Sequence, residues 1–161
     1  MLKKLSPMNK SELKEFLDEK VVLYNNPSFI ESDPIQIPHG FSLKEDIEIS
    51  GFLTATIAWG NRKMIINNAK KMMDLMGNSP YDFVMNHKDY HLEYLEPFVH
   101  RTFNGNDFKT FIVALQNLYQ KHGGLETFFT NKQEEFSMQP AISAFKKYFF
   151  EVDHLQRTTK H

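Results

Sequence analysis

Residues 42–77, SLKEDIEISGFLTATIAWGNRKMIINNAKKMMDLMG, decide the fold that is predicted for this chain. The first half is apolar or small almost throughout, and the second half repeats apolar residues at helical spacing. A helix that is apolar on most of its faces is usually buried. The pattern therefore predicts two helices, the first of which is the buried central helix of an all-α, multi-helix bundle.

Three signals mark the ends of these helices. Gly60 suits the left-handed conformation that ends many helices, and Asn61 is a favoured N-cap for the second helix. Ser42 and Glu45 have the spacing of a capping box at the start of the first. Within that first helix a run of small residues is expected to admit neighbouring helices closely: Gly51, Thr54, Ala55 and Ala58.

The second helix carries an excess of positive charge. Residues 61–76 contain four basic residues, Arg62, Lys63, Lys70 and Lys71. They contain one acidic residue, Asp74. Such a stripe often does no more than face solvent. The alternative concerns the turn between the two helices, residues 59–63, which we call the elbow. In this interpretation the elbow faces phosphate, because the amides of a helix N-terminus and basic side chains can bind an anion there.

The composition limits the class of protein. A length of 161 residues favours one domain over residues 1–161, and 15 phenylalanines indicate an aromatic core. The absence of cysteine excludes disulfides and cysteine-based catalytic or metal sites. Together with the lack of a signal peptide or membrane span, it favours a cytoplasmic protein without a membrane partner. The net charge of −1 means that nucleic-acid binding needs a local basic patch.

Further helices are predicted elsewhere in the chain. Residues 9–25 have an amphipathic pattern that begins with a capping-box spacing, and apolar stripes predict helices after Asn106, over 125–129 and from 139 onward. No alternation typical of strands is present. The last residues, HLQRTTKH, show no packing pattern.

Two junctions interrupt the helices. The segment 27–41 contains three prolines, which exclude a regular helix, and Ile35 and Ile37 are expected to reach the core from an extended chain. The junction 98–108 holds Arg101, which is either a structural anchor or a fork for phosphate or carboxylate. A ligand site is expected in a cleft between residues 33–41 and 100–106, formed by His39, His100, Arg101 and Asn104. No metal or other cofactor is expected.

Four phrases carry a family resemblance: DPIQIPHGF (33–41), ISGFLTATIAWGNRK (49–63), HRTFNGNDF (100–108) and HGGLE (122–126). Together they resemble an uncharacterised bacterial family, domain-of-unknown-function family 2400. Members of that family are longer than this chain, which implies that it is the N-terminal portion of a larger protein. Their C-terminal part resembles the helix-hairpin-helix DNA glycosylases, which remove damaged bases.

The resemblance implies a DNA-contacting part of a base-excision repair protein. In those glycosylases a buried helix ends in a polar elbow that approaches the minor groove, as the first half of this fold is expected to do. The residues expected to contact DNA are Trp59, Asn61, Arg62, Lys63, Lys70 and Lys71. The glycine-paired hairpin and catalytic Asp lie in the later half, so this chain is expected to lack catalytic residues. The missing C-terminal part is an expected partner.

A second hypothesis is a non-enzymatic helical module that binds a protein or a small ligand. The near-neutral charge and the lack of any nucleophile–base spacing favour it. A hydrolase with a carboxylate pair is the third reading, although helix capping accounts better for the acidic residues near position 45.

Overall fold

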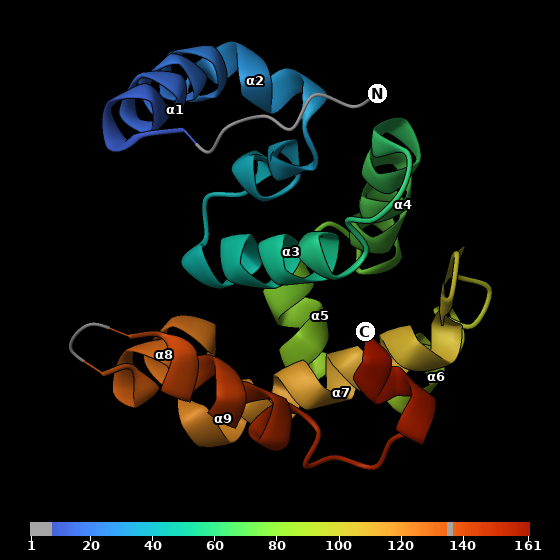
Figure 1. The fold of residues 1–161 in the computed structure, drawn as a ribbon. Helices are drawn as coiled ribbons and strands as arrows, with labels where there is room; N and C mark the ends of the chain where they lie inside the picture. The colour runs from blue at the N-terminus through green and yellow to red at the C-terminus, as the bar shows by residue number, and fades with distance from the viewer. Residues whose placement is uncertain (1–7, 135–136) are drawn as a thin grey trace, which may run out of the picture.

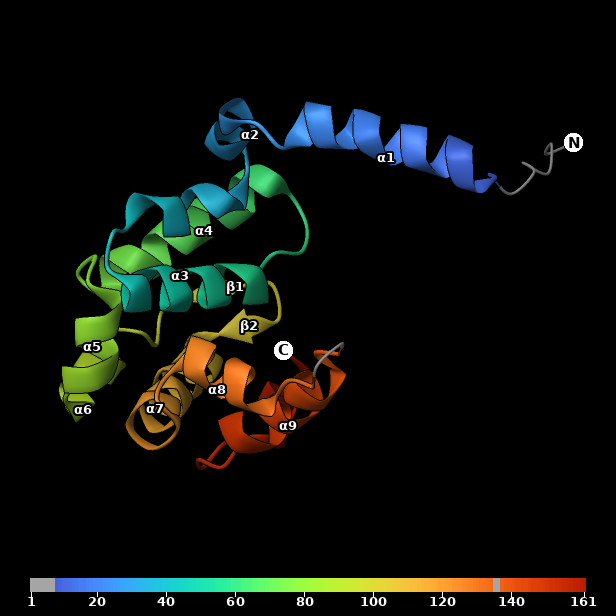
Figure 2. The same ribbon diagram turned by 90° about the vertical axis from the view of Figure 1, so that its left-hand side faces the viewer.

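The computed structural model describes residues 8–134 and 137–161, which form helices and one short ribbon (Figures 1 and 2). The α-helices are α1 (Lys10–Tyr24), α2 (Pro27–Ser32), α3 (Lys44–Thr56), α4 (Arg62–Leu75), α5 (Pro80–Asn86), α6 (Asp89–Glu93), α7 (Gly105–His122), α8 (Leu125–Lys132) and α9 (Gln139–Phe149). The 3₁₀ helices are η1 (Pro34–Gln36), η2 (Pro38–Gly40) and η3 (Gln156–Lys160). The antiparallel ribbon pairs β1 (Val99–His100) with β2 (Phe103–Asn104). The predicted all-α bundle is confirmed.

The bundle is assembled on α3 and α7. Helix α3 packs against α4, α5, η1 and η2, whereas α7 packs against α5, α8, α9 and β2. Figure 1 shows α5 running between the two. Phe52 of α3 stacks on Phe111 of α7 and meets Phe145 and Phe149 of α9 edge-on. Such contacts between rings add to the stability gained by burial, and the predicted aromatic core is confirmed.

The helix pair α3–α4 forms as predicted, but α3 ends at Thr56 with Ile57 as its C-cap, so the prediction that Gly60 ends the helix is wrong, and Gly60 lies in the elbow. Gly60 has a φ of +113°, and the side chain of Asn61 accepts a hydrogen bond from the Met64 amide at 3.1 Å. The predicted capping box at Ser42 is wrong, because α3 begins after Leu43 without a side-chain cap. An acidic residue of its first turn, Asp46, instead accepts a hydrogen bond from the Tyr81 amide at 2.8 Å, at the start of α5.

The proline-rich segment is more helical than predicted. Each of its three prolines stands at the start of a short helix, α2, η1 or η2, a position where the missing N–H costs nothing. Ile37 is buried as expected, but Ile35 is 44% exposed, so the prediction that both isoleucines enter the core from an extended chain is wrong.

The expectation that the chain contains no strand is wrong at one place. Each strand of the ribbon has two residues, too short to show an alternating pattern. The ribbon ends at Asn104, which caps α7 in place of the predicted Asn106. Asn104 and Asp107 form a capping box, so the helix begins earlier than predicted.

The C-terminal segment packs, contrary to the prediction. Thr158 is fully buried, and its hydroxyl donates to the buried carboxylate of Asp107 at 2.7 Å. The guanidinium of Arg157 donates to the same carboxylate. Because η3 is held by these polar bonds to a distant helix, no apolar periodicity marks it in the sequence.

Helix α1 forms with the predicted capping box but lies apart from the core. Asn9 accepts from the amide of Glu12, and Glu12 accepts from the amide of Asn9. None of the residues of α1 is buried. Figure 2 shows the helix extending from the body as an arm.

Candidate functional site

Three segments that are distant in sequence meet at the elbow between α3 and α4. The ribbon brings Arg101, whose own φ is +55°, to the elbow. A β-carbon placed on Gly60 would lie 2.6 Å from Nη1 of Arg101. Gly60 is therefore favoured by its backbone conformation, and the guanidinium of Arg101 lies in the space that a side chain at this position would enter.

His100 fixes the ribbon to the elbow and to α4. Its Nδ1 lies 2.9 Å from Nδ2 of Asn68, and its Nε2 lies 3.4 Å from the carbonyl oxygen of Trp59. Because the amide donates and the carbonyl accepts, both contacts fit a neutral ring protonated at Nε2. His100 is only 1% exposed. Both its nitrogens are thus occupied by the fold.

η3 completes a polar pocket around Trp59, which we name the Trp59 pocket. The indole of Trp59 stacks on the ring of His161, with ring centres 6.1 Å apart and planes inclined by 14°. The cavity has a volume of about 470 Å³, and its lining residues are Thr56, Trp59, Thr102, Arg157, Lys160 and His161. Among the described lining residues, none is acidic. The arrangement combines an aromatic surface with the positive charge of Lys160, while the guanidinium of Arg157 pairs with Asp107, which does not line the pocket, and it suits an anionic ligand with a planar group.

The basic residues of α4 lie on different sides of the helix. Arg62 turns toward η1, where its Nη2 lies 3.8 Å from Oδ2 of Asp33. Lys63 and Lys70, seven residues apart, share a face and are exposed. Lys63 lies about 100° around the axis from Arg62. Lys71 extends over the ring of Phe98, just before the ribbon. The elbow itself is exposed from Gly60 through Lys63.

The expected ligand residues do not all meet. His100 and Arg101 adjoin the elbow. The side chain of Asn104 accepts hydrogen bonds from the amides of Asn106 and Asp107 as the cap of α7. His39 lies on η2 and lines a different cavity, against α1 and α2.

Sequence reasoning missed the contribution of η3. Arg157, Lys160 and His161 belong to a tail that lacks helical or strand periodicity. The cluster of basic residues in RTTKH was the available signal, but only the bonds to Asp107 bring it beside Trp59.

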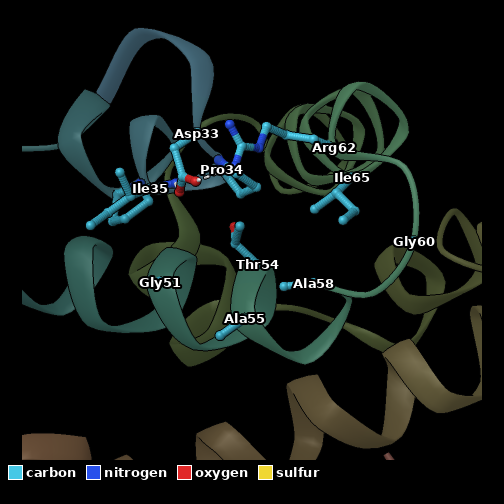
Figure 3. A pocket seen from close by; sticks show the side chains of 11 residues that line it. Asp33, Pro34, Ile35, Gly51, Thr54, Ala55, Ala58, Gly60, Arg62 and Ile65 are labelled. Carbon is cyan, nitrogen blue, oxygen red and sulfur yellow. Dashed lines mark hydrogen bonds and ion pairs between the residues drawn. The ribbon is translucent and has the colours of Figure 1, made fainter. Parts of the chain in front are cut away.

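A second cavity lies between α3, α4 and η1 (Figure 3). Its volume is about 430 Å³. The small residues Thr54, Ala55 and Ala58 of α3 face it, where a closely packed neighbouring helix was expected. At Gly51 the neighbour is η2, and a β-carbon there would lie 3.7 Å from Cβ of Pro38, an ordinary van der Waals distance.

The structure also bears on the requirements of a metal site and of a membrane-spanning helix. Within residues 8–134 and 137–161, no group of three His, Asp or Glu side chains is placed to hold a metal ion. Over the same residues, none of the helices combines the length and apolar character needed to cross a bilayer.

The fold and the site define an all-helical protein in which an elbow, a ribbon and a C-terminal turn share one polar face. The chain belongs to the DUF2400 family, described as a protein of unknown function, whose model matches residues 33–161. The match includes the elbow, the ribbon and η3 and leaves out α1 and α2. No curated protein and no solved structure matches the chain.

Proposed function

We propose that this protein contacts DNA through the face that the elbow, the ribbon and η3 form, as the helical part of a base-excision-type repair protein. One observation carries the proposal: basic side chains line the pocket beside the partly buried Trp59, and another lies at the adjoining Gly60. Lys160 and Arg157 come from η3, and Arg101 comes from the ribbon. The guanidinium of Arg157 is also paired with Asp107.

The charges on this face suit a phosphate backbone. The net charge of the chain is −1, so attraction to DNA has to come from such a local cluster. Lys63 and Asn61 lie exposed at the N-terminus of α4, where backbone amides and the helix dipole favour an anion. Lys70, about two turns further along α4, lies beside η1 and η2, where it lines a hollow with Gln36 and Ile37, and is not part of this face.

The aromatic surface adds a contact for a base. Trp59 is partly buried and packs on His161, which fixes the plane of the indole. Stacking of a base on an aromatic side chain contributes about 1–3 kcal/mol and tolerates any sequence. The face is therefore expected to prefer DNA that is single-stranded or locally opened over a regular duplex.

The alternative function, binding of a protein or small ligand at His39, His100, Arg101 and Asn104, has less support. His100 and Asn104 make their hydrogen bonds within the fold. Of the three expected ligand residues near the ribbon, only the exposed Arg101 is therefore available to bind a ligand, and it adjoins the proposed DNA-contacting face.

Salt-dependent binding tests the DNA proposal. Fluorescence anisotropy of a labelled single strand and of a matched duplex is measured from low to physiological salt. The double variant Lys63→Gln/Lys160→Gln is expected to bind at least about fivefold more weakly and to reduce the salt slope by about 1.4 to 1.8, because each lost phosphate contact removes about 0.7–0.9.

The control is Lys121→Gln/Lys132→Gln, which removes the same charge at the far end of α7 and on α8. It is expected to keep the affinity and the slope of the wild type. Absence of binding by the wild type at low salt, or an equal loss in both double variants, would overturn the proposal.

A further inference from the structure

The cavity of Figure 3 holds a buried hydroxyl that the fold does not use. Thr54 is only 4% exposed, and its Oγ1 has no hydrogen-bond partner. In Figure 3 this oxygen points from α3 into the cavity, toward η1. A buried polar atom without a partner costs free energy, and a ligand atom in the cavity would supply the missing bond.

Opposite Thr54, the cavity is closed by one positive and one negative group. The guanidinium of Arg62 and the carboxylate of Asp33 face each other across 3.8 Å, beyond hydrogen-bond distance. Oδ1 of Asp33 accepts from the Ile35 amide at 3.0 Å, which holds the carboxylate in place. The side chain of Arg62 is 57% exposed, and its guanidinium also lies over the ring of Phe29, 5.9 Å from the ring centre.

The remaining walls are apolar. Ala55 and Ala58 form the side toward α3, Ile65 comes from α4, and Pro34 and Pro38 come from η1 and η2. The volume of about 430 Å³ lies within the range of small-molecule sites, about 300–1,000 Å³. A compact apolar group therefore fits beside the charged pair.

The paired charges select among ligands. An anion that approached Arg62 would meet Asp33, and a cation that approached Asp33 would meet Arg62, so each would leave one charge poorly paired. A molecule with adjacent positive and negative groups satisfies both. We infer that the cavity binds a free α-amino acid with an apolar side chain: its carboxylate pairs with Arg62, its ammonium pairs with Asp33, and the hydroxyl of Thr54 bonds to the bound head group.

L-Leucine is the probe for this site, followed by calorimetry and by saturation-transfer NMR on the full chain. Saturable binding is expected with a Kd at or below about 1 mM. L-Leucinamide lacks the carboxylate and N-acetyl-L-leucine lacks the ammonium, so each is expected to bind at least about tenfold more weakly.

Two variants test the residues. Thr54→Val keeps the shape and removes the hydroxyl, so it is expected to keep or raise the melting temperature while weakening leucine binding at least about fivefold. Ala58→Leu fills the cavity from an exposed position and is expected to abolish binding. Thr110→Val, on α7, is the matched control, since its hydroxyl bonds to the carbonyl of Asn106, and it should bind leucine as the wild type does.

Absence of saturable leucine binding would overturn the inference. Equal binding of the amide or the acetylated compound, or wild-type affinity in Thr54→Val, would do so as well. The inference and the DNA proposal fail separately, because the cavity and the Trp59 pocket share no lining residue.

Discussion

At the scale of single residues, Tyr119 of α7 is held between the core and α3. Its hydroxyl donates to Oε2 of Glu48 at 2.6 Å. Burial, and then the hydrogen bond and the negative charge of Glu48, raise the pKa of the Tyr119 hydroxyl far above its ordinary value. The hydroxyl therefore stays protonated in the folded protein at pH values where the unfolded chain loses that proton, above about 10.

This pKa shift predicts a loss of stability at high pH. Its contribution is fully present below about pH 10, and above that point the unfolded chain binds fewer protons than the folded one, so the free energy of unfolding falls by at most about 1.4 kcal/mol per pH unit. Urea unfolding between about pH 8 and pH 11 measures the slope. In Tyr119→Phe the free energy of unfolding is expected to fall less steeply with pH above about pH 10 than in the wild type. Equal slopes in the two proteins would contradict the raised pKa of Tyr119.

At the scale of elements, Asp107 joins the start of α7 to η3. Its carboxylate accepts from the amide of Asn104 at 2.9 Å and from the side chains of Arg157 and Thr158. It is fully buried, so these donors replace the hydrogen bonds that water would otherwise make to its oxygens. One side chain thus both caps a helix and fixes the segment that completes the Trp59 pocket.

Replacing Asp107 by alanine is therefore expected to release η3. The change leaves the hydroxyl of Thr158 and the guanidinium of Arg157 without their partner and removes part of a helix cap, at a cost of at least about 2 kcal/mol in the free energy of unfolding. Urea unfolding measures the cost, and hydrogen exchange is expected to accelerate at residues 156–161. The control Asp153→Ala, at an exposed position, should change neither the free energy of unfolding nor the rate of hydrogen exchange at residues 156–161. Unchanged exchange in Asp107→Ala would show that other contacts hold η3.

At the scale of the whole molecule, α1 and the rest of the fold differ in packing. Helix α1 buries none of its residues, and apolar side chains such as Leu17 and Val21 are half exposed or more. The family match begins at residue 33, after this helix and α2. The stability of the bundle is therefore expected to come from α3 onward.

Removal of residues 1–25 tests this division. Because almost no apolar surface is lost from the core, the free energy of unfolding is expected to change by less than about 1 kcal/mol. Limited proteolysis of the intact chain should cut first within residues 10–26. A large fall in the melting temperature of the shortened chain would show that α1 packs on the body in solution.

The sequence indicated those features that depend on neighbouring residues. The elbow was predictable because Gly60 and Asn61 act within one turn of chain, and the cap of α1 was predictable because Asn9 and Glu12 bond to each other. The cap at Ser42 failed because α3 begins one residue later than the capping-box spacing requires, with Leu43 at the N-cap position. The ribbon was missed because two residues per strand leave no period to detect.

By itself, the sequence determined that this chain is helical and where its main helices lie, because periodicity and capping act over a few residues. Only the tertiary structure decided the candidate sites. The Trp59 pocket depends on contacts such as His100 to Trp59 and Thr158 to Asp107, which join residues 41 and 51 positions apart. The cavity beside Thr54 exists because η1 and α4 leave the small residues of α3 uncovered. Such contacts are set by how the helices pack, which no local pattern records.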